Sequence, residues 1–146
     1  MDDNVDILLV EDSEDDAVFF QHAMKEAGVS GRLRHVRDGV EALACIFGAN
    51  GESNGKPLTR PRLIVLDLKM PKVNGMEVLQ RLKANPRTRN IPVVVWSSSE
   101  EKQDLAVAYE LGANSYLVKP MDFDELTGLI QALGRYWLQY NQAPKS

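Results

Sequence analysis

Four large apolar residues stand together at Leu63-Ile64-Val65-Leu66, and the charged residue Asp67 follows them directly. Such a run, with no polar residue alternating in it, predicts a β-strand that is buried on both faces. Strands of this kind belong to parallel sheets covered by helices on both sides. Because burying a charge is costly, we expect Asp67 at the carboxyl end of the strand, where solvent or a ligand can reach it.

Other apolar runs along the chain alternate with segments of helical spacing. The further strand candidates are 7–10, 33–36, 92–96 and 115–118, and the helix candidates are 17–27, 38–46, 76–84, 100–111 and 122–140. Strands that alternate with helices predict an α/β fold with a doubly wound, five-stranded parallel sheet. The right-handed crossover rule favours the flavodoxin-like strand order 2-1-3-4-5, with helices on both faces.

Length and composition are those of one globular domain spanning residues 1–146. We expect a core at about 5–135, a helical C-terminal extension at about 135–146, and a long surface loop at 48–61, where Gly, Asn, Ser and Pro are frequent. No output domain is expected after the last helix. The net charge of −4 argues against nucleic acid as a partner, and no apolar segment is long enough for a membrane. The single Cys45 is compatible with the reducing cytoplasm.

Polar residues follow four of the five strand candidates and should meet at one edge of the sheet. They are Glu11 and Asp12 after the first strand, Asp67 after the third, Ser97 after the fourth and Lys119 after the fifth. Carboxylates without a nearby His or Cys favour Mg²⁺. A carboxylate, Mg²⁺, a hydroxyl and an ammonium together suit phosphoryl transfer. Asp67 would then be the nucleophile that forms an aspartyl phosphate, with Glu11 and Asp12 as metal ligands and Ser97 and Lys119 as phosphate-binding groups.

These motifs resemble those of the receiver domains of two-component response regulators. The matching segments are Leu9-Val10-Glu11-Asp12, Leu66-Asp67-Leu68-Lys69-Met70-Pro71, Asn74-Gly75, Ser97 and Tyr116-Leu117-Val118-Lys119-Pro120, and the resemblance spans about residues 5–135. It implies that a sensor histidine kinase passes a phosphoryl group to Asp67 with Mg²⁺ as cofactor. The chain would be a signalling protein rather than an enzyme, assisting only its own phosphotransfer and dephosphorylation.

The resemblance also assigns roles to individual residues. It implies that the backbone carbonyl of Lys69 is a metal ligand, that Ser97 and Tyr116 form a conformational switch, and that the Lys119–Pro120 bond is cis. Glu11 departs from the family pattern, since the first acidic position is more often Asp. The 48–61 loop and the aromatic C-terminal end resemble small stand-alone regulators paired with phytochrome-type kinases.

The last helix candidate carries an apolar seam. Its members are Leu126, Ile130, Leu133, Trp137 and Tyr140, at spacings of four and three. From residue 122 to 140 the helix would span roughly 28 Å at about 1.5 Å per residue, whereas a five-residue strand covers about 17 Å. The final turns should therefore overhang the sheet and leave Tyr136, Trp137 and Tyr140 without a core. We expect homodimerisation or partner docking through them.

Two other functions remain open as alternatives. A dehalogenase-type aspartyl phosphatase would need a second Asp two residues after the nucleophile, where this chain has Lys69. A phosphorylation-independent adaptor with the receiver fold would have no need of Asp67 or Lys119. Both alternatives are disfavoured by the residues that the chain contains.

Overall fold

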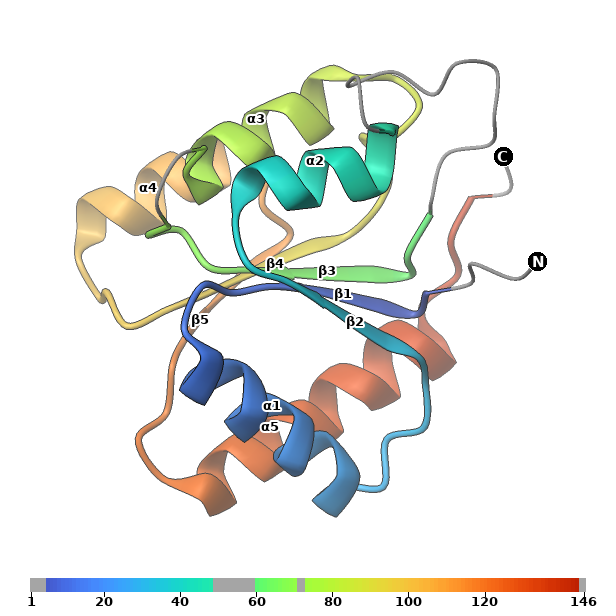
Figure 1. The fold of residues 1–146 in the computed structure, drawn as a ribbon, viewed down its shortest axis with the longest axis vertical. Coiled ribbons are helices and arrows are strands. Elements are labelled where there is room, and N and C mark those ends of the chain that lie inside the picture. The colour runs from blue at the N-terminus through green and yellow to red at the C-terminus, as the bar shows by residue number, and fades with distance from the viewer. Residues whose placement is uncertain (1–4, 49–59, 71–72, 145–146) are drawn as a thin grey trace.

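The computed structural model describes residues 5–48, 60–70 and 73–144 (Figure 1). In these ranges the elements are β1 (Ile7–Val10), α1 (Glu14–Glu26), β2 (Leu33–Val36), α2 (Gly39–Phe47), β3 (Leu63–Leu66), α3 (Gly75–Ala84), β4 (Val93–Ser97), α4 (Lys102–Glu110), β5 (Ser115–Val118), α5 (Phe123–Gly134) and the π-helix η1 (Arg135–Tyr140). The strands pair in parallel in the order β2-β1-β3-β4-β5. The predicted fold class and strand order are confirmed.

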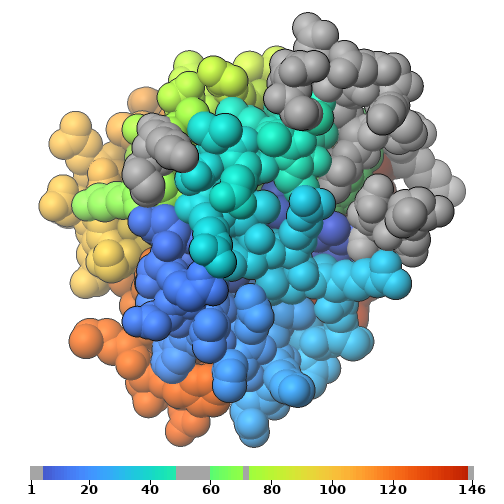
Figure 2. All heavy atoms as spheres, in the orientation of Figure 1, coloured from blue at the N-terminus to red at the C-terminus, as the bar shows by residue number. Residues whose placement is uncertain are grey.

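Helices cover both faces of the sheet, as the doubly apolar strands require. Figure 1 shows α2, α3 and α4 on one face and α1 and α5 on the other. Every residue of β1, β3 and β4 is buried. One core lies between the sheet and α2, α3 and α4, and the other joins the sheet to α1 and α5 through residues such as Phe20 and Trp96. In the space-filling view, the segment that opens α5 (orange) lies beside α1 (blue) (Figure 2).

Side-chain caps begin the helices where the sequence predicts them. Asp38 accepts a hydrogen bond from the backbone N–H of Glu41 at 2.8 Å, at the start of α2. Asp122 does the same for Glu125 at 3.2 Å, at the start of α5. Such caps satisfy N–H groups that have no partner inside the helix, and they fix where each helix leaves the carboxyl edge of the sheet.

The C-terminal helix differs from the prediction after Gly134. The α-helical hydrogen bonding ends there and η1 continues to Tyr140, closed by a 2.7 Å bond from the N–H of Asn141 to the carbonyl of Tyr136. The residues buried along this segment are Leu126, Ile130, Gly134 and Leu138. Leu133 and Trp137 of the predicted seam are partly buried against the same core, whereas Tyr140 lies outside it. At this point the helix lies close to the loop after α1, because a Cβ on Gly134 would lie only 2.7 Å from Val29.

The aromatic residues at this end have different environments. Tyr136 and Tyr140 are 51% and 65% exposed, as expected for residues without a core. Trp137 is half-buried and packs against the core that includes α1 and α5, so the expectation that it lacks a core is wrong. Its ring contacts that of Tyr136 edge-on, with 4.8 Å between the centroids. The exposed apolar surface at this end is therefore carried by the two tyrosines.

Two predictions about chain organisation fall partly outside the described residues. The expected loop at 48–61 consists largely of residues 49–59, which lie outside them. The division into a core and a C-terminal extension stays a prediction. Across 5–48, 60–70 and 73–144, the structure contains no helix with the length and apolarity needed to span a bilayer.

Candidate functional site

The strand register brings the predicted site residues to one edge of the sheet. Val10 pairs with Leu66, so the residues that follow them, Glu11 and Asp67, are neighbours at the ends of β1 and β3. At the other side of the edge, the N–H of Lys119 donates to the carbonyl of Ser97 at 2.8 Å. Parallel strands thus place residues distant in sequence side by side at their carboxyl ends, where ligands bind in open α/β sheets.

Three carboxylates form a compact cluster at this edge. One oxygen each from Glu11, Asp12 and Asp67 lies within 4.8 Å of the other two. Glu11 is fully buried, Asp67 is 5% exposed, and Asp12 is exposed to solvent. An open cluster of oxygen ligands, two of them shielded from water, fits a hard divalent cation such as Mg²⁺.

The ammonium of Lys119 lies among these carboxylates. Its Nζ is 2.8 Å from Glu11 Oε1 and 3.6 Å from Asp67 Oδ2. It is also 2.8 Å from Oδ2 of Asp16, a residue of the first turn of α1 that the sequence analysis did not single out. On another side the ring of Trp96 lies 5.0 Å from Nζ, close enough for a cation–π interaction. Lys119 is therefore held at several points and offers a positive charge beside Asp67.

Burial dominates the electrostatics of the site. Burial, together with the neighbouring charge of Asp67, raises the pKa of Glu11 to about 7, against the opposing effect of Lys119. Burial also raises the pKa of Asp67, against the attraction of Lys119. For Lys119 itself, burial would lower the pKa, but the hydrogen bonds to Asp16 and Glu11 outweigh that effect and raise it. Without a metal, Glu11 and Asp67 therefore retain protons more readily than exposed carboxylates do, and a bound cation would oppose that tendency.

The two predicted switch residues, Ser97 and Tyr116, both form hydrogen bonds with Ser99. Ser97 is fully buried, and its Oγ accepts a hydrogen bond from the N–H of Ser99 at 3.1 Å. The phenol of Tyr116 donates to the carbonyl of Ser99 at 2.9 Å. The Ser99 hydroxyl in turn donates to Asp104 of α4. The loop after β4 therefore connects the site edge to α4, through a residue that the sequence analysis did not identify.

The loop after β3 is held close to Asp67. The N–H of Lys69 donates to Asp67 Oδ1 at 3.3 Å, which fixes the orientation of that carboxylate. A Cβ on Gly75 would lie 2.2 Å from the carbonyl oxygen of Asp67, so only glycine fits at the start of α3. Close packing of α3 against this loop thus depends on Gly75.

One backbone prediction is wrong. The Lys119–Pro120 bond is trans in the structure, since none of the peptide bonds in the described ranges is cis. The trans isomer is favoured for X–Pro bonds by roughly 0.5–1 kcal/mol, and the contacts of Lys119 form with it. The side chain of Lys119 reaches the acidic cluster without the predicted isomer.

The fold and this edge define an α/β domain that presents a carboxylate cluster, a lysine and a buried serine at the carboxyl ends of its strands. The family model described as "Response regulator receiver domain" matches residues 7–131, and the chain belongs to this family. The prediction made from the motifs is confirmed at the level of the family.

Similar proteins cover nearly the whole chain. The probable methanogenesis regulatory protein FilR2 of Methanothrix harundinacea is 41% identical over 94% of this chain and 86% of its own length. Response regulator Rcp1 of Synechocystis is 40% identical over 91% of this chain and 88% of its own. A crystal structure of Rcp1 in its Mn²⁺-bound form aligns with a TM-score of 0.80 at 37% identity, covering 95% of this chain and 98% of that one. The phosphorylated cyanobacterial phytochrome response regulator RcpA aligns with a TM-score of 0.82 at 34% identity, covering 97% and 99%.

Proposed function

We propose that Asp67 accepts a phosphoryl group from the phosphohistidine of a sensor histidine kinase. A carboxylate oxygen of Asp67 forms the new O–P bond while the P–N bond breaks. The electron pair of that bond stays on the imidazole nitrogen, which then takes up a proton. The observation that carries this proposal is the buried Asp67 carboxylate, with Lys119 3.6 Å away and two further carboxylates beside it. Phosphoryl transfer needs chiefly such positioning and positive charge.

The cofactor in this proposal is Mg²⁺, held by Glu11, Asp12, Asp67 and the backbone carbonyl of Lys69. The carboxylate cluster and the Mn²⁺-bound form of Rcp1 support a divalent cation at this edge. When bound, the metal supplies positive charge for the phosphoryl oxygens. Lys119 would contact one of those oxygens, and the hydroxyl of Ser97 would donate to another.

Output would follow from a shift between two conformations. Drawing the Ser97 hydroxyl to the phosphoryl group would compete with its bond from Ser99, and Tyr116 is joined to the same residue. The phosphorylated state would therefore bias the loop after β4 through differential contacts. In this proposal the chain signals through protein contacts in the cytoplasm and catalyses nothing beyond its own phosphotransfer and dephosphorylation.

Intact mass spectrometry with a small phosphodonor tests the proposal. Wild-type protein incubated with acetyl phosphate should gain one phosphoryl group when Mg²⁺ is present and none when it is chelated. Asp67→Asn should gain none in either condition. A wild type that forms no Mg²⁺-dependent adduct would overturn the proposal, as would an equal adduct on Asp67→Asn.

We also propose homodimerisation, or docking of a partner, through the C-terminal end of the chain. The exposure of Tyr136 and Tyr140 supports it, because neighbouring exposed aromatic residues commonly anchor interfaces. Light scattering of the wild type should give a mass above that of a monomer. Replacing both tyrosines with serine should lower it, whereas Tyr109→Ser, at an equally exposed site on α4, should not. A wild type with the mass of a monomer would exclude the homodimer, and a double tyrosine variant that keeps a dimeric mass would exclude association through Tyr136 and Tyr140.

A further inference from the structure

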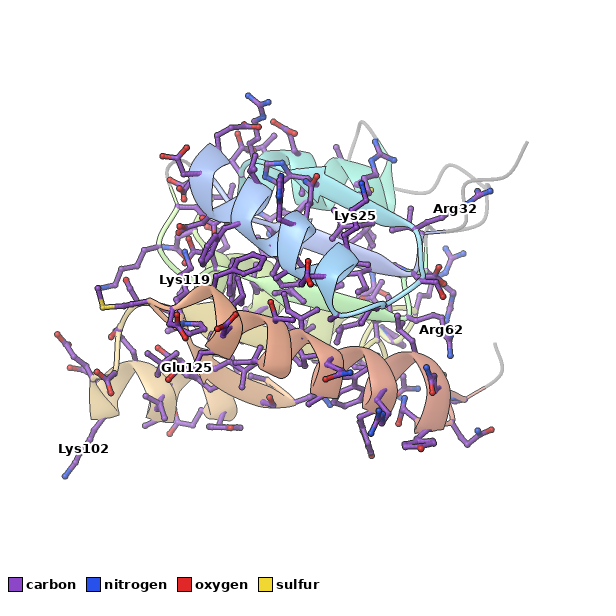
Figure 3. The ribbon with its side chains drawn as sticks, turned by 90° about the horizontal axis from the view of Figure 1, so that it is seen from below. Lys25, Arg32, Arg62, Lys102, Lys119 and Glu125 are labelled. Carbon is purple, nitrogen blue, oxygen red and sulfur yellow. The ribbon has the colours of Figure 1, made fainter. Side chains whose placement is uncertain are left out.

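Asp16 lies outside the carboxylate cluster and is nevertheless among the nearest partners of Lys119. Its Oδ2 is 2.8 Å from Nζ, a distance equal to that of Glu11 Oε1. The backbone of Asp16 is held in the first turn of α1, because its N–H donates to the hydroxyl of Ser13, which caps the helix. Figure 3 shows Lys119 near the start of α5, at the opposite end of the molecule from Arg62. The ion pair between Asp16 and Lys119 therefore links α1 to the residue that follows β5, and this link lies at the carboxylate cluster.

Lys119 and a divalent cation require the same negative charges. In the structure the ammonium is 2.8 Å from Glu11 and 3.6 Å from Asp67, two of the three groups that form the cluster. Two cations on the same carboxylates repel each other strongly at such short range. A metal held by Glu11 and Asp67 would therefore weaken the contact of Lys119 with Glu11, while the proposed function keeps Lys119 close enough to Asp67 to meet a phosphoryl oxygen.

We propose that Asp16 is a positioning residue for Lys119, an inference that rests on the proposed function for the identity of the metal. Asp16 holds the ammonium on the side of α1, so that Glu11 is released to Mg²⁺ without Lys119 leaving the site. The ring of Trp96 contacts the same ammonium from another side and so restricts the other positions that it could take. Without the charge of Asp16, Lys119 keeps its contacts with Glu11 and Asp67 and competes more strongly with the metal.

Metal titration of two matched variants tests this role. Asp16→Asn and Asp15→Asn each remove one negative charge from adjacent positions of the first turn of α1, but Asp15 is exposed, and the ion pair with Lys119 is made by Asp16. We expect Asp16→Asn to weaken Mg²⁺ binding by about threefold to tenfold in calorimetry, and to keep most of that effect in high salt because the contact is short. Asp15→Asn should change the affinity by less than about twofold, and salt should remove the difference. Equal affinities for the two variants, or tighter binding by Asp16→Asn, would overturn the proposal.

A second pair of variants asks whether the effect passes through Lys119. In a Lys119→Met background, Asp16→Asn should change Mg²⁺ affinity no more than Asp15→Asn does. An undiminished effect of Asp16→Asn in that background would assign it to general charge and overturn the proposal. A wild type that binds no Mg²⁺ would instead contradict the assignment of Mg²⁺ as the cofactor in the proposed function, and the positioning role of Asp16 would fail with it.

Lysine reactivity gives an independent measurement that needs no Lys119 variant. With Mg²⁺ bound, Lys119 should be acylated by an amine reagent several-fold faster in Asp16→Asn than in the wild type, because it has lost the partner that retains it. Peptide mapping can use the exposed Lys25 as an internal reference. Unchanged reactivity of Lys119 relative to Lys25 would contradict the positioning role.

Discussion

The phenol of Tyr116 donates a 2.9 Å hydrogen bond to the carbonyl of Ser99, whose own N–H donates to Ser97 Oγ at 3.1 Å. One residue of the loop after β4 thus holds both side chains of the predicted switch. The switch itself stays a prediction, but the structure contains hydrogen bonds that connect Ser97 to Tyr116 through Ser99. Any force that draws the Ser97 hydroxyl toward Asp67 acts on the residue that anchors Tyr116.

Tyr116→Phe should therefore lower the free energy of unfolding by about 1 kcal/mol, the usual contribution of one hydrogen bond. It should also speed amide hydrogen exchange in the loop after β4. Tyr109→Phe, at a half-exposed site on α4, is the control and should change neither quantity. Chemical denaturation measures the free energy of unfolding, and hydrogen-exchange mass spectrometry measures the exchange rate in the loop. Indistinguishable behaviour of the two variants would contradict the role assigned to the Tyr116 hydrogen bond.

The raised pKa of Glu11 predicts that Mg²⁺ affinity depends on pH. Below about 7 this carboxyl holds a proton that the metal must displace, so affinity should rise with pH and level off above about 7. Glu11→Gln should remove most of this dependence while weakening binding. Calorimetry at a series of pH values measures it. An affinity that is flat between pH 5 and pH 8 would contradict the assignment.

The same pKa predicts an unusual pH dependence of stability in the metal-free protein. A carboxyl whose pKa is raised on folding stabilises the folded state below its unfolded pKa, and that contribution is lost as pH rises through the folded value. Between pH 4.5, the ordinary pKa of a glutamate, and about pH 7, the free energy of unfolding should therefore fall, by about 3 kcal/mol at about 1.4 kcal/mol per pH unit. Excess Mg²⁺ should suppress the fall. Denaturation of the chelated protein at pH 5 and pH 8 checks the sign, and a metal-free protein that gains stability over this range would contradict it.

Two glycine substitutions should have opposite effects. Gly75→Ala places a Cβ 2.2 Å from the carbonyl of Asp67, so we expect a loss of about 2 kcal/mol and a disturbed site. Gly128→Ala has no atom within 4 Å of the new Cβ and lies inside α5, where alanine is favoured by about 0.5–1 kcal/mol. Thermal denaturation compares the two. Equal tolerance of both changes would show that α3 does not need its close approach to the site.

The C-terminal segment gives a direct test of its packing. Leu138 is 9% exposed within η1, and Leu138→Ala should cost about 2–4 kcal/mol. Tyr140→Ala, at a residue that is 65% exposed, should leave the stability of the monomer nearly unchanged. Urea denaturation at low protein concentration separates these effects from any change in association. A larger loss for Tyr140 than for Leu138 would instead favour the seam predicted from the sequence.

Sequence reasoning was most successful where local chemistry decides the structure. Apolar runs such as 63–66 determine the buried strands, and the strand order then brings Glu11 and Asp67 together. Packing between distant segments was harder to predict. The contact of Gly134 with Val29 and the π-helix that follows depend on tertiary fit, so helical periodicity did not identify Gly134 and Leu138 as buried residues.

Two site residues were missed for a similar reason. Asp16 is one of three acidic residues in the first turn of α1, Glu14, Asp15 and Asp16, and only the structure shows which of them reaches Lys119. Ser99 acts mainly through its backbone N–H and carbonyl, which every residue except proline carries, so the sequence gives no signal for it. The trans Lys119–Pro120 bond was predicted wrongly because the expectation came from the family pattern alone.

The most direct test of the central claim is to locate the phosphoryl group. The protein is incubated with acetyl phosphate and Mg²⁺, reduced with borohydride, which converts an aspartyl phosphate to homoserine, and mapped by peptide mass spectrometry. We predict homoserine at position 67 in the Mg²⁺-treated wild type and none in a sample treated with chelator. Homoserine at Asp12 or at another carboxylate, with none at position 67, would contradict the account.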